Sequence, residues 1–158
     1  MEEDQYRETY HTINQLRCIF EKAIISRQCA CHLSLRFNLA DREGIACTSS
    51  MNHDRCQQLL RLLRTNASFT LQMYDINGPL PHAKEIKVQV GGLNGLSQVV
   101  FPDEQNNTPV TDIAGLIQRA EVIFGPVESL PYSEIIKAIA RFKGRQHKKK
   151  DRKNISPE

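Results

Sequence analysis

Apolar residues recur at helical spacing in several parts of the chain. Residues 6 to 25 carry one apolar stripe, and residues 48 to 64 carry a second. Two further stretches, Thr111 to Phe124 and Pro131 to Phe142, show the same spacing of three or four residues. This spacing predicts four amphipathic helices, and a short helix is also predicted around Leu33 to Arg42.

A period of two replaces the helical spacing in the middle of the chain. Apolar and polar residues alternate from 68 to 74 and again from 86 to 90, and a third short run spans 98 to 101. Such alternation predicts half-buried strands. The pattern therefore predicts an α+β fold, with helices at both ends and a small three-stranded antiparallel sheet between them.

The glycine-rich run from Val90 to Leu96 is predicted to be a tight turn or a bulge. It lacks the lysine and the hydroxyl residue of a nucleotide phosphate loop, and strand-like residues follow it. The chain also shows no recognisable hydrolase motif and no marked pair of carboxylates. The sequence therefore assigns the protein to no class of enzyme.

All five cysteines lie within one quarter of the chain. A chain of 158 residues with 40% apolar composition can fold without disulfides, and an odd number of thiols cannot pair internally. Thiolates are soft ligands, so four of them predict a metal or iron–sulfur site with one cysteine left over. The candidate ligands are Cys18, Cys29, Cys31, Cys47 and Cys56.

The packing pattern ranks these cysteines as ligands. Cys29, Cys31 and Cys47 come first, because they occupy irregular sequence in which no packing role is assigned to them. Cys18 comes next, since it lies nearly opposite the apolar stripe of its predicted helix. Cys56 comes last because it shares a helical face with leucines and has an alternative role in packing. The lesser candidates in the same window are His32 and His53.

The cysteine spacing favours an iron–sulfur cluster over zinc. Structural zinc sites usually contain pairs of cysteines with two to four residues between them, and this chain has no such pair. Basic residues could offset the negative charge of a thiolate-bound cluster. We expect electron transfer with a redox partner protein, or redox sensing, and a thiol redox enzyme using Cys29 and Cys31 is a further alternative. The basic residues are Arg17, Lys22, Arg27, Arg36 and Arg55.

Positive charge concentrates at the end of the chain. Residues 143 to 158 contain seven of the 21 basic residues and two of the 18 acidic ones, although the net charge of the whole chain is only +3. We expect one domain over residues 1 to 142 and a disordered tail that could bind an anionic partner. An alternative function is therefore a zinc-stabilised, nucleic-acid-associated protein. The basic residues of the tail are Lys143, Arg145, Lys148, Lys149, Lys150, Arg152 and Lys153.

The beginning of the chain is acidic and polar, unlike a signal peptide. No segment approaches the roughly 18 apolar residues of a membrane span. We therefore expect a cytoplasmic protein that is not transmembrane and whose thiols are reduced.

Deleting residues 143 to 158 is expected to remove any affinity for nucleic acid and to leave the fold and metal content unchanged. Without aromatic residues between its cations, the tail offers attraction to phosphates and no base stacking. Binding measured against salt should weaken by about one log unit per log unit of salt for each phosphate contacted. Binding that survives the deletion, or that ignores salt, would contradict the prediction.

Overall fold

Helices make up more than half of the part of the chain that the structure describes. The structure, a computed structural model, describes residues 2–14, 16–72, 80–104 and 109–143 of the chain. Within these ranges there is one sheet, which has two strands. The elements in order are α1 (Glu3–Ile13), α2 (Glu21–Ile25), β1 (Ser34–Leu39), β2 (Arg42–Cys47), α3 (Ser50–Ala67), α4 (His82–Val100), α5 (Ile113–Phe124), the 3-10 helix η1 (Val127–Ser129) and α6 (Tyr132–Arg141).

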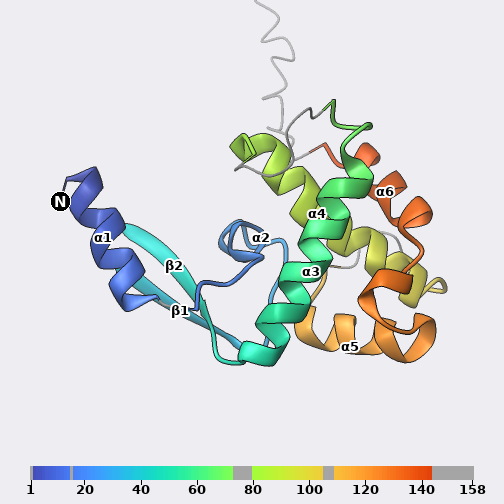
Figure 1. Cartoon of the computed structure of the whole chain (residues 1–158), viewed down its shortest axis with the longest axis horizontal. Helices are drawn as coiled ribbons and strands as arrows, with labels where there is room; N and C mark the ends of the chain where they lie inside the picture. The colour runs from blue at the N-terminus through green and yellow to red at the C-terminus, as the bar shows by residue number, and fades with distance from the viewer. Residues whose placement is uncertain (1, 15, 73–79, 105–108, 144–158) are drawn as a thin grey trace, which may run out of the picture.

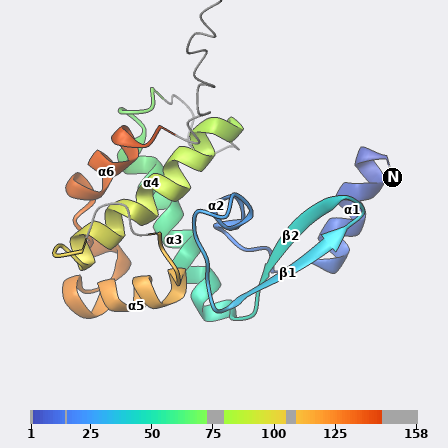
Figure 2. The ribbon, with the colours of Figure 1, turned by 180° about the vertical axis from the view of Figure 1, so that it is seen from behind.

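The elements form two parts that meet at α2. Figure 1 shows α3, α4, α5 and α6 gathered into a helical bundle, while α1 and the β1–β2 hairpin extend to one side as an arm. The reverse view in Figure 2 shows the same separation, with α2 between the arm and the bundle. Helix α2 contacts both β2 and α4, so it connects the two parts.

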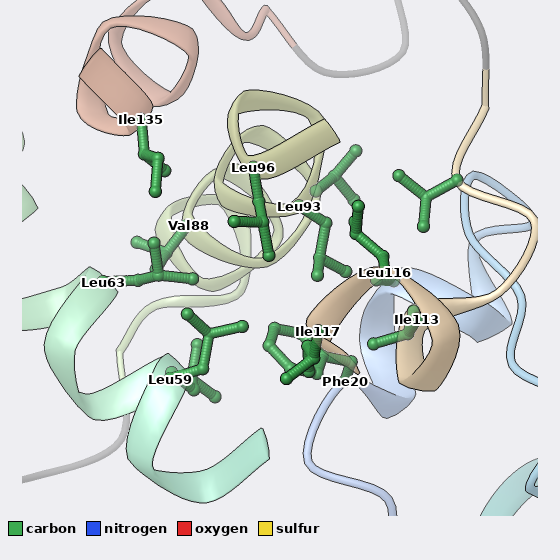
Figure 3. Packing of buried hydrophobic residues seen from close by; sticks show 14 of the residues in the cluster. Phe20, Leu59, Leu63, Val88, Leu93, Leu96, Ile113, Leu116, Ile117 and Ile135 are labelled. Atoms are coloured by element: carbon green, nitrogen blue, oxygen red, sulfur yellow. The ribbon is translucent and has the colours of Figure 1, made fainter. Parts of the chain in front are cut away.

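The bundle encloses an apolar core. Figure 3 shows side chains from α3, α4, α5 and α6 converging on one another, together with Phe20 at the start of α2. Leu59, Leu63, Leu93 and Ile135 are fully buried in this cluster. Burial of this kind stabilises the fold by about 1.5–3 kcal/mol for each large apolar side chain.

The predicted three-stranded sheet is wrong. Residues 86–90 and 98–100 lie within α4, residues 68–72 form turns after α3, and residues 73 and 74 lie outside the described part of the chain. The error has a physical cause, since α4 is buried on most of its circumference and therefore lacks a single apolar stripe. The alternating Ile86, Val88 and Val90 thus imitate a strand inside a helix.

A hairpin replaces the short helix predicted around Leu33 to Arg42. Strands β1 and β2 pair antiparallel from Ser34 opposite Cys47 to Leu39 opposite Arg42. Phe37 lies opposite Gly44, and a Cβ atom added to Gly44 would lie only 2.4 Å from the Phe37 ring. A glycine at this position therefore makes room for the aromatic ring.

The first predicted helix, residues 6 to 25, is interrupted. It forms α1 and α2, with an irregular connection between them. Within this connection the Asn14 amide donates a hydrogen bond to the Ile45 carbonyl (3.0 Å), and Arg17 forms a β-bridge with Ala46. These contacts with β2 compete with continuation of the helix.

The other three predicted amphipathic helices are confirmed as α3, α5 and α6. Each differs from the predicted range by only a few residues at its ends. In α3, the Ser49 side chain accepts a hydrogen bond from the backbone N–H of Asn52, as a helix cap does. Among the described residues, no helix is both long and apolar enough to cross a membrane.

The glycine-rich run forms the contact between α4 and α6. It lies inside α4, so the predicted turn or bulge is also wrong. A Cβ atom at Gly91 would lie 2.8 Å from the Cα atom of Ile139, and one at Gly95 would lie 2.6 Å from the Ile135 carbonyl oxygen. The glycines therefore permit the backbones of the two helices to approach closely.

Gly91→Ala and Gly95→Ala are each expected to lower the free energy of unfolding by about 1–3 kcal/mol. The added methyl group would meet backbone atoms of α6, which cannot move aside as a side-chain end can. Asn94→Ala in the same helix is the matched control, and its better helix propensity should leave stability unchanged or slightly raised. Chemical denaturation measures all three; equal stability of the glycine variants and the control would contradict this packing.

Candidate metal centre

Four of the five cysteines line one small cavity. Cys18 lies between α1 and α2, Cys31 precedes β1, Cys47 ends β2 and Cys56 lies in the second turn of α3. The cavity has a volume of about 20 Å³. Four separate segments therefore bring thiols to one place. The apolar part of its wall includes Ile19, Phe20, Leu33, Ile113 and Ala114.

Backbone pairing brings Cys18 and Cys47 to the cavity. The N–H of Cys18 donates to the Ile45 carbonyl (2.9 Å), and the N–H of Cys47 donates to the Leu16 carbonyl (2.8 Å). The segment before α2 thus runs antiparallel to the end of β2 and is held there by the isolated Arg17–Ala46 bridge. The position of both thiols depends on this pairing, which has no signal in the spacing of the cysteines.

Cys31 reaches the cavity through contacts with the start of α5. The N–H of Ala30 donates to the Val110 carbonyl (2.9 Å), and the N–H of Ile113 donates to the Ala30 carbonyl (2.9 Å). These two bonds hold the Cys-Ala-Cys run against residues 110–113. The first turn of α5 consequently lies against the thiol of Cys31.

Cys29 does not join the other four cysteines. Its side chain is only 5% exposed, belongs to the apolar core and does not line the cavity. Burial alone raises the pKa of Cys29 to about 12, without a contribution from another thiol. Although the sequence ranks Cys29 among the first ligands, the fold gives it a packing role.

Cys56 and His53 line the cavity from the same face of α3, as their spacing of three residues predicts. The Nε2 atom of His53 already forms a hydrogen bond with the Arg17 carbonyl (2.9 Å). The fold therefore uses His53 to connect α3 to the Cys18 segment. Cys56, which the sequence ranks last among the candidate ligands, lines the cavity and also packs against the apolar core.

Backbone N–H groups point at two of the thiols. The N–H of Phe20 donates a hydrogen bond to Cys18, and the N–H groups of Leu33 and Ala114 donate to Cys31. Each bond favours the thiolate and lowers the pKa of the cysteine, which burial raises more strongly. N–H donors around sulfur are one means by which proteins stabilise and tune metal–thiolate centres.

Burial favours the protonated form of three of these thiols. It raises the pKa of Cys18 to about 12, and it raises the pKa values of Cys31 and Cys56 as well. Neighbouring thiols add to the shift: Cys56 is affected by Cys18, Cys31 and Cys47. A metal that binds Cys18, Cys31 and Cys56 must therefore displace protons.

Four of the five basic residues of the region, all of them arginines, are paired with carboxylates, whereas Lys22 has no carboxylate partner among the described residues. Arg17 pairs with Glu21 (2.8 Å), while Arg27 and Arg36 both pair with Glu43. Arg55 pairs with Glu121 of α5 (3.5 Å). These arginines therefore form structural ion pairs, and their charges are largely balanced before any cluster binds.

Cys31 also belongs to a second, more exposed group of ligand atoms. Its sulfur, one ring nitrogen of His32 and one carboxylate oxygen of Asp112 all lie within 4.8 Å of one another. The His32 Nδ1 atom is 2.8 Å from Asp112, and the N–H of His32 donates to the same carboxylate (3.1 Å). The bonds from His32 lower the pKa of Asp112 although partial burial raises it. The carboxylate thus fixes the chain next to Cys31.

The basic tail contributes one residue to the described part of the chain, Lys143. The other predicted contacts of the tail, Arg145, Lys148, Lys149, Lys150, Arg152 and Lys153, lie outside the described residues. The predicted interaction with nucleic acid therefore stays a prediction from the sequence.

Comparison of the chain with protein-family models, with curated proteins and with solved structures finds no match. The interpretation of the cysteine site consequently depends on its own geometry and chemistry.

In the folded, metal-free protein, Cys18 and Cys29 are expected to react with iodoacetamide about a thousandfold more slowly than in the unfolded chain at about pH 8. Alkylation requires the thiolate, and burial raises both pKa values from 9.0 to about 12. The rates should increase as the pH is raised toward these values. Mass spectrometry of labelled peptides, with and without denaturant, measures each cysteine; equal rates in both states would contradict the burial.

Proposed function

We propose that this protein holds an iron–sulfur cluster on Cys18, Cys31, Cys47 and Cys56 and uses it for electron transfer or redox sensing. The observation that carries the proposal is the convergence of four thiols from four segments on one cavity. Thiolates are the usual protein ligands of such clusters, which supply one-electron redox chemistry when bound. Cys29 is the cysteine left over.

The separation of the sulfur atoms favours a cluster over a single zinc ion. In a tetrahedral zinc site with Zn–S bonds of about 2.3 Å, the sulfurs lie only about 3.8 Å apart. Among the described residues, the one group of three ligand atoms within 4.8 Å of one another is that of Cys31, His32 and Asp112. The four cysteine sulfurs do not form such a group, and we infer from this that they suit a centre larger than one ion.

The size of the cavity points the other way. A volume of about 20 Å³ holds little more than one water-sized group, which would suit a single ion. The sulfur positions are the more constrained of the two features, because each sulfur is one bond away from a Cβ atom held by the backbone. The cavity volume depends also on the rotamers of longer residues in its wall, such as Ile19 and Leu33.

The alternative of a thiol redox enzyme requires Cys29 and Cys31 to exchange electrons with a substrate. An exchanging thiol must be accessible and partly ionised. Cys29 is buried in the apolar core, and its pKa is raised to about 12. These properties support the metal centre over the exchange reaction.

Replacing Cys18, Cys31, Cys47 or Cys56 by serine is expected to reduce bound iron at least about tenfold, because a hydroxyl does not replace a thiolate on a soft metal. Cys29→Ala is the matched control, and it should keep full metal content while lowering stability by a small amount. Iron, acid-labile sulfide and visible absorbance are measured on each protein, purified without oxygen.

Loss of the metal in Cys29→Ala with retention in Cys56→Ser would contradict the proposed ligand set. If the wild-type protein is colourless and contains one equivalent of zinc, the four cysteines form a structural zinc site and do not hold a cluster. Wild-type protein without iron or zinc, even after reconstitution with iron and sulfide, would show that the convergence of thiols does not form a metal centre.

A further inference from the structure

A second cavity lies beside the four thiols. Its volume is about 640 Å³, within the range of roughly 300–1,000 Å³ that is typical of small-molecule sites. Residues of α2, α3 and the start of α4 form its wall. Cys18, Ile19 and His53 line both this cavity and the smaller one at the thiols, so the two spaces adjoin.

A buried polar network forms one side of the larger cavity. Glu85 and Gln89 of α4 are only 4% and 3% exposed. One carboxylate oxygen of Glu85, Oε1, accepts hydrogen bonds from Arg64 of α3 and from the Gln89 amide (2.9 Å). Gln89 in turn accepts a bond from the N–H of Ala23 (3.1 Å). The network therefore joins α2, α3 and α4 around the cavity.

Two atoms of this network remain without a partner among the described residues. They are Oε2 of Glu85 and Nε of Arg64, and both are buried. Leaving such groups unsatisfied is unfavourable. The first atom accepts a hydrogen bond and the second donates one. A hydroxyl group both accepts and donates hydrogen bonds, so it is the type of ligand group that suits these two atoms.

Two further cations give the cavity an excess of positive charge. Glu21 pairs with Arg17 and Glu85 pairs with Arg64, so these four charges balance. Lys22 and Arg61 also line the cavity, and neither has a carboxylate partner in the described part of the chain. The excess charge favours a ligand that carries a phosphate or a carboxylate group.

We propose that this cavity binds a small anion that also carries hydroxyl groups, in the chemical class of sugar phosphates and hydroxy acids. Lys22 and Arg61 contact the anionic group, and Arg64 and Glu85 contact a hydroxyl group. The ligand then lies beside Cys18, next to the proposed cluster. Its position relative to a metal rests on the proposed function, whereas its binding to the cavity does not.

Isothermal titration of the full-length protein tests the proposal with two probes, ribose 5-phosphate and malate. Ribose, which lacks the anionic group, is expected to bind at least about tenfold more weakly than ribose 5-phosphate. Succinate, which lacks the hydroxyl group, is expected to bind at least about tenfold more weakly than malate. Stronger binding of the phosphate probe or of the carboxylate probe identifies which anion the cavity prefers. Failure of both probes to bind would overturn the proposal.

Two variants test the residues. Lys22→Gln and Arg61→Gln each remove one of the two cations that have no carboxylate partner among the described residues, and each should weaken binding about tenfold or more. Glu134→Gln and Lys137→Gln alter an exposed ion pair of α6 and serve as controls with unchanged affinity. If Lys22→Gln lowers the thermal midpoint, the affinity of Arg61→Gln, at an exposed position, gives the answer. Unchanged affinity in Arg61→Gln would overturn the proposed anion site.

Metal content is measured on the same preparations, which separates the two proposals. Ligand binding by a protein that holds no metal even after reconstitution would contradict only the proposed function. A protein that holds iron but binds neither probe would contradict only the ligand site.

Discussion

The buried carboxylate of Glu21 connects the arm of the molecule to its bundle. Glu21 is 6% exposed and accepts hydrogen bonds from the Tyr10 hydroxyl of α1, from Arg17 and from the backbone N–H of Ile45 in β2 (2.9 Å). A buried carboxylate without such partners would cost several kcal/mol, so the partners must assemble around it. Because Cys18 and Cys47 are near neighbours of these groups in the chain, this requirement also positions two of the four thiols.

The cysteine site lies where the two parts of the molecule meet. Cys18 and Cys47 belong to the segments that pair with each other in the arm, while Cys56 belongs to α3 of the bundle and Cys31 contacts the start of α5. The bundle is held by its apolar core and by the close contact of α4 with α6. A metal bound to all four thiols would therefore stabilise the connection between arm and bundle, since ligand binding stabilises the state that holds the ligands together.

Local pattern predicts the parts of this fold that have one solvent-exposed face. Helices α3, α5 and α6 follow a spacing of three or four residues and were predictable from it. Helix α4 was not, because it is surrounded by other elements and because Gly91 and Gly95 suggest a turn when the neighbouring helix is unknown. The hairpin contains an alternation in Leu35, Phe37 and Leu39, which was the available signal for a strand.

The cysteine cluster was predictable as a group, but its membership was not. Cys29 and Cys31 are separated by one residue and have similar sequence surroundings, so no local rule distinguishes them. The distinction arises from pairing with residues 110–113, about eighty positions away, which places Cys29 in the core and Cys31 at the cavity. Cys56 shows the opposite case. It lies on the leucine face of α3, which suggests a packing role, yet it also lines the cavity with the other thiols. Burial pattern alone therefore cannot separate a packing cysteine from a ligand when the site itself is formed at the edge of the apolar core.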